Sequence, residues 1–314
     1  MTRLREAWRA WVELADRREP PTALALVRIA VGLVMLGDFL WVWHVGLVDP
    51  LWSHAPLGFA TSYRSWTGLG AHGLWLAATL ASAAVLVGAG TRVACVALLL
   101  VSAQLAIVDP NSESAIDAIL RVVLAILALS RCNARWSVDA WIARRLGRPM
   151  PAEIPAWPRY LLMIQLVWIY FSAGQNKSSA AWGPLGGFTA LANALGDPHA
   201  ARWAPGWLAV VYPLTRVATA LTITFELTAP AYLLYYYYAA TAERPGRLRA
   251  WCNRLRLRWA WIAIGVMFEL GIAVTMRLGS FPFGMLALYP VLLRPRELQR
   301  WNTAAPENRA SSPS

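Results

Sequence analysis

The chain has 314 residues, of which 58% are apolar and only 15% are charged, and its mean hydropathy is +0.43. Soluble domains carry about 25% charged residues, so this composition excludes an ordinary soluble globule and a disordered chain. The net charge is +12. In so apolar a chain it favours arginines that face anionic membrane lipid over binding to nucleic acid.

Apolar runs separated by charged or Gly/Pro-rich breaks predict an all-α, polytopic transmembrane helix bundle with about eight spans. The predicted spans lie at 24–44, 73–90, 93–108, 115–130, 160–176, 217–239, 259–276 and 281–293. Pro230 is expected to kink the sixth span because proline lacks a backbone donor. The last run is short for a full crossing, so a re-entrant or buried segment is the alternative there.

The basic residues predict the orientation of this bundle. With a cytoplasmic N-terminus, the inner segments hold 22 lysine and arginine residues and the outer segments hold five. Cytoplasmic loops are enriched in these residues, so we expect both termini in the cytoplasm. The chain then divides into a cytoplasmic amphipathic interfacial helix over 1–23, a transmembrane domain over 24–300 and a disordered tail over 301–314.

Six ionisable side chains fall inside the predicted spans, where an unpaired charge costs at least about 2.5 kcal/mol. They are Arg28, Asp38, Asp117, Arg121, Glu226 and Glu269. Arg28 is near a cytoplasmic end and can snorkel, whereas Asp117 and Arg121 share a helix face and can pair. The carboxylates favour the outer leaflet, which predicts a polar cavity open to the outer face. The alternative is that each acid separately caps or bonds a neighbouring helix.

Lys177 is the only lysine of the chain, and it closes the fifth span shortly before Trp182. An amine at the mouth of an apolar pocket can serve as a base or nucleophile, which arginine cannot readily do. The alternative is a lysine that snorkels at a helix end. The three cysteines and four histidines have no metal-ligand spacing, so no metal site is predicted.

Two motifs resemble those of the HTTM domain, the membrane domain shared with vitamin K-dependent gamma-carboxylase. They are Tyr170-Phe171-x-Ala173-Gly174-x-x-Lys177 followed by Trp182, and Arg135-Trp136-Ser137-Val138-Asp139. Weaker matches in the family's order are Asp117-x-x-x-Arg121, Glu226-x-x-x-Pro230, Phe268-x-Leu270-Gly271-Ile272 and Met285…Tyr289-Pro290…Pro295. The resemblance covers roughly 20–300.

The resemblance implies an activity. In the carboxylase, the lysine of this motif deprotonates reduced vitamin K, and oxygenation of that quinol yields the stronger base that acts on glutamate. It therefore implies a base at Lys177 and a reduced quinone as the co-reactant. Two departures argue against glutamate carboxylation: 109–114 contains no histidine, and Glu269 occupies a position where many members have histidine. The smaller sporulation-delaying protein B type, which takes part in maturing a secreted peptide, is similar in length.

Three hypotheses follow. The first is an enzyme of the bacterial cytoplasmic membrane that acts on a peptide or quinol at the outer face. Its catalytic residues would be Lys177, Glu226, Glu269 and Asp117, with Trp182, Arg121, Asp38 and Tyr170 binding substrate. The second is a non-catalytic partner (chaperone, exporter or immunity protein) of a small secreted peptide or its companion maturation protein. The third is a transporter, although the chain has no visible internal repeat.

Overall fold

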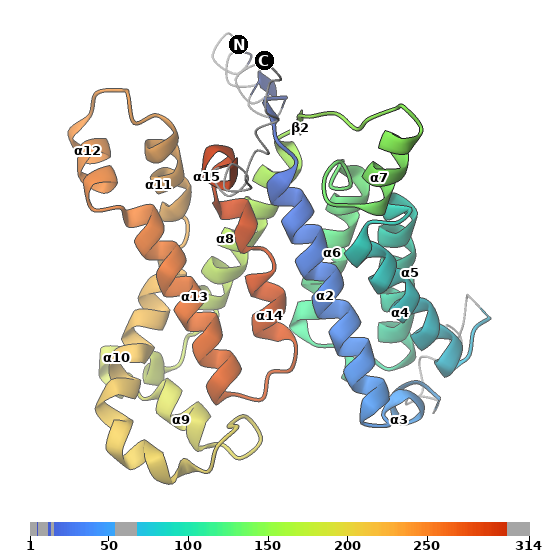
Figure 1. Cartoon of the computed structure of the whole chain (residues 1–314). Coiled ribbons are helices and arrows are strands. Elements are labelled where there is room, and N and C mark those ends of the chain that lie inside the picture. Colours follow the sequence, from blue (N-terminus) through green and yellow to red (C-terminus); the bar gives the residue numbers. More distant parts are fainter. Residues whose placement is uncertain (1–4, 6–11, 14–15, 54–67, 300–314) are drawn as a thin grey trace, which may run out of the picture.

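A computed structural model of the chain describes residues 5, 12–13, 16–53 and 68–299. Long helices run between two ends of the molecule (Figure 1). Most of the predicted interfacial helix over 1–23, and all of the predicted tail over 301–314, lie outside the described residues.

The first group of helices forms an up-and-down bundle. Its members are α2 (Thr22–His44), α4 (Ala71–Val87), α5 (Thr91–Val108) and α6 (Ala115–Leu129). The connecting elements are α3 (Val48–Trp52) and the 3-10 turn η2 (Pro110–Ser112). Gly32 of α2 lets the α4 backbone approach closely, since a Cβ there would lie 2.6 Å from the Leu86 Cα.

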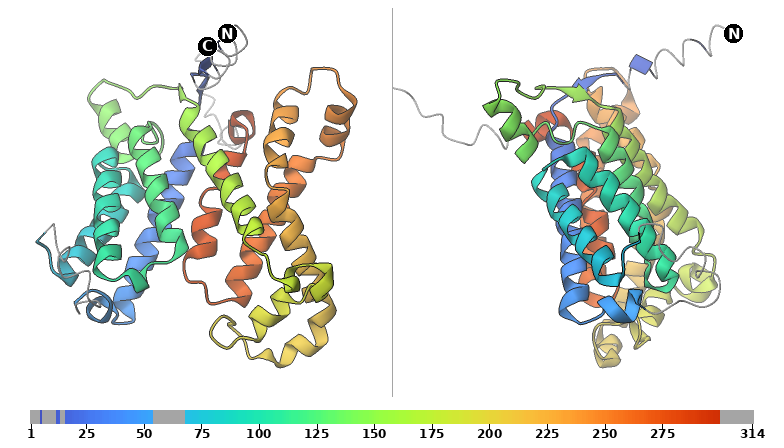
Figure 2. Two further views of the ribbon diagram at one scale, coloured as in Figure 1. Left: turned by 180° about the vertical axis from the view of Figure 1, so that it is seen from behind. Right: turned by 90° about the vertical axis from the view of Figure 1, so that its right-hand side faces the viewer.

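The second group lies beside the first (Figure 2). Its members are α8 (Trp157–Gln175), α10 (Leu208–Leu227), α11 (Ala231–Ala240) and α13 (Leu257–Thr275), joined through α9 (Ala190–Gly196) and α12 (Arg247–Arg254). Short 3-10 turns, η3 (Ala180–Trp182), η4 (Pro184–Gly186) and η5 (Pro205–Trp207), lie in the connections. The groups are bridged by α14 (Phe281–Leu286), which contacts α2, α6 and α13, and by η6 (Tyr289–Leu292), which contacts α2 and α8.

Among the described residues, four helices are long and apolar enough to cross a membrane. They are Thr22–His44, Thr91–Val108, Pro205–Leu227 and Leu257–Thr275. Shorter apolar helices are Ala71–Val87 and Phe281–Leu292. The structure is therefore mostly helical and fits a membrane protein, whereas the count of eight spans stays a prediction.

The sixth predicted span, 217–239, is not one continuous helix in the structure. The helix begins at Leu208 rather than near residue 217, ends at Leu227, and is followed by a second helix from Ala231. Pro230, which caps that second helix, cannot continue the hydrogen-bond ladder of the first because it has no N–H. The expected kink is thus a complete break.

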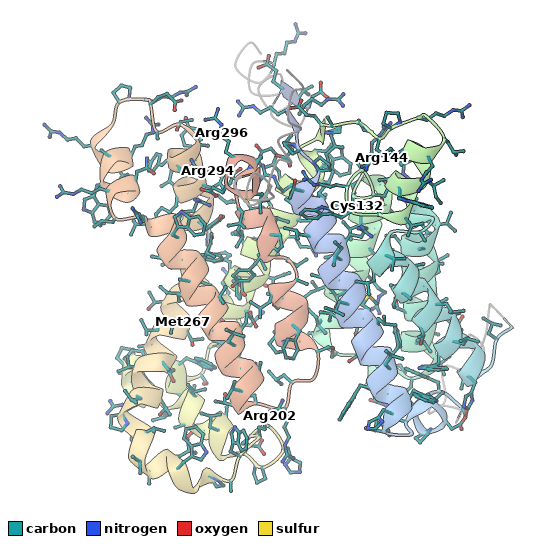
Figure 3. All side chains as sticks on the ribbon, in the orientation of Figure 1. Cys132, Arg144, Arg202, Met267, Arg294 and Arg296 are labelled. Carbon is teal, nitrogen blue, oxygen red and sulfur yellow. The ribbon has the colours of Figure 1, made fainter. Side chains whose placement is uncertain are left out.

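Arginine-rich elements gather at one end of the molecule. That end carries α7 (Val138–Arg145), α12, α15 (Pro295–Gln299) and a two-stranded antiparallel ladder in which Arg18 of β1 (Arg18–Glu19) faces Pro155 of β2 (Ile154–Pro155). Arg144, Arg294 and Arg296 lie there, and Arg202 lies at the opposite end, which carries α3 and α9 (Figure 3). The direction of these ends across a membrane stays a prediction.

Arg28 does not snorkel, contrary to expectation. Its side chain is fully buried and donates to the carbonyls of Val85 (2.8 Å), Leu86 (2.9 Å) and Trp136. The last carbonyls of a helix have no partners within the helix, and Arg28 satisfies those at the end of α4. Gly88, with φ +71°, makes room, because a Cβ there would lie 2.4 Å from the Arg28 Nη1.

Asp139, the last residue of the Arg-Trp-Ser-Val-Asp motif, binds the turn that follows this end of α4. The Asp139 carboxylate accepts hydrogen bonds from the backbone N–H groups of Gly90 (2.7 Å) and Thr91 (3.0 Å), the Thr91 hydroxyl (2.8 Å) and the Asn133 amide (2.9 Å). Burial raises the pKa of Asp139, but these hydrogen bonds outweigh burial and hold the pKa below its ordinary value. The motif therefore locks α7 onto the turn between α4 and α5.

We predict that Asp139→Asn lowers the melting temperature of the solubilised protein at pH 7, by about 2–4 °C. A folded-state pKa below the unfolded value means that ionised Asp139 stabilises the fold above about pH 4. That stabilisation is lost as the pH falls through the folded-state pKa, so the two melting curves should converge in acid. Identical melting temperatures at pH 7 would contradict this role.

Candidate functional site

An ion pair joins Lys177, just after α8, to Glu226 near the end of α10. The Lys177 Nζ donates to Glu226 Oε1 at 2.7 Å and lies 2.6 Å from Oε2. The Glu226 side chain is 3% exposed and that of Lys177 is 20% exposed. A buried carboxylate therefore holds the Lys177 side chain, which stays partly accessible, and this differs from a lysine that snorkels freely.

Local sequence brings the two charges together. Gly174 lets α10 approach the last turn of α8, because a Cβ there would lie 2.9 Å from Glu226 Cβ and 3.1 Å from the Leu227 backbone nitrogen. The Trp182 ring completes the surroundings, with the Lys177 Nζ 4.9 Å from its centroid. This is within the range of a cation–π interaction. The motif's glycine, lysine and tryptophan thus each have a geometric role.

A second carboxylate lies deeper in the same helix group. The Tyr170 hydroxyl of α8 donates to Glu269 Oε1 of α13 at 2.5 Å and lies 2.9 Å from the Tyr289 hydroxyl of η6. Glu269 is fully buried, and its Oε2 has no hydrogen-bond partner among the residues that the structure describes. One buried acceptor therefore remains open to a donor.

Aromatic rings surround the tyrosine that donates to this second carboxylate. The Tyr170 ring lies 5.0 Å from the centroid of Phe225, 5.8 Å from that of Trp261 and 6.3 Å from that of Phe268, all edge-on. Such rings exclude water, and exclusion of water strengthens electrostatic interactions. The predicted residues Lys177, Glu226, Glu269, Tyr170 and Trp182 thus belong to one region between α8, α10 and α13.

Tyr289 was not among the predicted site residues. It belongs to the site because Gly265 of α13 leaves space for it: a Cβ on Gly265 would lie 2.1 Å from the Tyr289 hydroxyl. A glycine inside an apolar helix, one turn before Glu269, was the available signal. The tyrosine that fills the space is far along the chain, so the sequence alone did not connect them.

Asp38, Asp117 and Arg121 lie elsewhere. The predicted pairing of Asp117 with Arg121 was wrong: Asp117 accepts from the Ser114 N–H (2.7 Å) and hydroxyl (2.9 Å) at the start of α6, and Arg121 pairs with Glu113. As the third residue of α6, Asp117 is placed for a capping box. These residues line a separate cavity with Asp38, and none of the Lys177 group lines it. The residues that were expected to share one polar cavity therefore form two separate groups in the structure.

The comparison with known families agrees with the motifs. The model of the HTTM domain matches residues 16–242. The chain belongs to the HTTM domain family. The matched region of this HTTM protein includes both partners of the Lys177–Glu226 pair, whereas Glu269 and Tyr289 lie beyond it. No solved structure matches the chain.

We predict that Gly265→Ala destabilises the HTTM protein and Gly271→Ala does not. Both glycines lie in α13, but a Cβ on Gly265 would overlap the Tyr289 hydroxyl, whereas a Cβ on Gly271 would meet nothing within 4 Å. Overpacking of this kind costs about 1–3 kcal/mol. Thermal unfolding in detergent checks this, and equal melting temperatures for the two variants would refute the packing role of Gly265.

Proposed function

We propose that this HTTM protein is a membrane enzyme in which Lys177 serves as a base toward a quinol or peptide at the outer face of the bacterial cytoplasmic membrane. The contact between the Lys177 amine and the buried Glu226 carboxylate carries the proposal. A primary amine with a carboxylate in direct contact has a built-in acceptor for its own proton.

The chemistry starts from the ion pair. Transfer of one proton from the Lys177 ammonium to Glu226 leaves a neutral amine with a free lone pair and a neutral carboxylic acid. The amine then takes a proton from an acidic hydroxyl of the substrate, and the new ammonium lies beside the substrate anion. Charges within the site stay balanced in each step, which matters where water is scarce.

A reduced quinone fits the residues on this side of the bundle. The Oε2 of Glu269, which has no partner among the described residues, would accept a hydrogen bond from a quinol hydroxyl, and the half-buried Phe268 would offer aromatic surface to its flat ring. When bound, the quinol supplies the acidic hydroxyl that the amine deprotonates. A peptide could use the same amine, so maturation of a secreted peptide remains within the proposal, whereas glutamate carboxylation is not part of it.

The alternative is a non-catalytic membrane partner of a small secreted peptide. It is favoured by the contacts that Lys177 already makes with Glu226, Trp182 and the Ala173 carbonyl at 3.5 Å. In that case the ion pair only holds α8 against α10. A complex with the peptide would then survive the loss of the amine.

Lys177→Arg separates the two. Arginine preserves the charge opposite Glu226 but cannot act as a base at neutral pH. Dissolved dioxygen serves as the two-electron acceptor of the assay, in which the quinol and O2 give the quinone and H2O2 through the quinol anion. We expect this oxidation of a reduced naphthoquinone by the protein in nanodiscs to fall by about 10²–10⁴-fold, with insertion and melting temperature little changed. Arg202→Lys, an exchange at an exposed residue that bonds the Met276 carbonyl, is the matched control. Full activity of Lys177→Arg would refute the enzyme proposal.

A further inference from the structure

A second site lies in the first helix group, away from Lys177. It is a cavity of about 80 Å³ among α2, α5 and α6, at the end of the molecule that carries α3 and η2. One water needs about 10–15 Å³ on this scale, so the cavity has room for a group about the size of one amino-acid residue.

The cavity carries an uncompensated negative charge. Glu113 and Arg121 on its wall neutralise one another, and Asp117 accepts two hydrogen bonds from Ser114. Asp38 on α2 has no ion-pair partner in the part of the chain that the structure describes. Asp117, a second carboxylate, lines the same cavity. A cationic group beside Asp38 would be attracted to both carboxylates.

A buried donor on the same wall points independently to a ligand. Trp52 of α3 lines the cavity and is only 8% exposed, yet its buried indole N–H has no hydrogen-bond partner in the part of the chain that the structure describes. Buried indole N–H groups usually have an acceptor. An acceptor atom on a bound molecule would supply it.

The rest of the wall is mainly apolar. It includes the side chains of Val34, Met35 and Phe39 from α2 and of Leu105 from α5. A ligand that uses the whole cavity therefore combines three features: a cation for Asp38, a hydrogen-bond acceptor for Trp52, and a compact apolar group.

We infer that this cavity binds the free amino terminus of a peptide whose first residue is apolar. The ammonium group pairs with Asp38, the first carbonyl accepts from the Trp52 N–H, and the side chain packs on the apolar wall. Binding here is independent of the chemistry at Lys177, since the two sites share no lining residue.

The test uses four small probes on the full chain in nanodiscs, with binding measured by calorimetry or saturation-transfer NMR. L-Leucinamide carries all three features, N-acetyl-L-leucinamide lacks the cation, 3-methylbutylamine lacks the carbonyl, and glycinamide lacks the side chain. We expect L-leucinamide to bind best and the acetylated form to lose at least about tenfold. Loss of the carbonyl should cost about fivefold. Equal affinities for N-acetyl-L-leucinamide and L-leucinamide would overturn the inference, and this comparison needs no substitution in the protein.

Variants then test whether Asp38 and Trp52 form the binding site. Asp38→Asn should reduce L-leucinamide affinity about tenfold, and Trp52→Phe should reduce it to the affinity of 3-methylbutylamine. Asp197→Asn, at an exposed acid that bonds His199, should bind L-leucinamide as the natural chain does. Unchanged affinity in folded Asp38→Asn would place the ligand elsewhere. A failure here leaves the proposal for Lys177 standing, because that proposal is tested by quinol oxidation.

Discussion

The ion pair between Lys177 and Glu226 constrains the whole second helix group. Two charges inside an apolar bundle each lose several kcal/mol of hydration, and only close pairing recovers that cost. The carboxylate on α10 must therefore meet the amine that follows α8, and the small Gly174 permits the approach. The break before Pro230 follows directly after this contact and lets the chain continue as α11.

The exposed fraction of the side chains falls from Lys177 through Glu226 to the deeper Glu269. After the end of α8, the Lys177 side chain stays partly accessible beside Trp182. Glu269 and Tyr170 are buried, and aromatic rings pack around Tyr170. The first helix group holds its own cavity, with Asp38 on its wall, at the same end of the molecule as α3. Our two proposals assign a base to the first site and a binding cavity to the second, and the two sites share no lining residue.

Much of the helical architecture could be predicted from apolar periodicity, because helix length and hydropathy are local properties. Lys177 and Glu226 were also named from the sequence, since charges in apolar runs stand out. The predictions that failed concern residues that bind a competing partner nearby or a partner that lies far away in the sequence. Asp117 was drawn to the helix start by Ser114 rather than to Arg121, and Arg28 found carbonyl partners that only the folded α4 end exposes. Tyr289 reaches the site through space that Gly265 leaves, which no local pattern encodes.

Chemical labelling of the only lysine tests the central claim most directly. Right-side-out and inside-out membrane vesicles are treated with a membrane-impermeant amine-reactive ester, and modification of Lys177 and of the N-terminal amine is measured by mass spectrometry. We predict that Lys177 is labelled in right-side-out vesicles, and faster in Glu226→Gln, where the ion pair is gone, whereas the N-terminal amine is labelled in inside-out vesicles. Labelling of Lys177 only in inside-out vesicles, or at an equal rate in Glu226→Gln, would contradict the account.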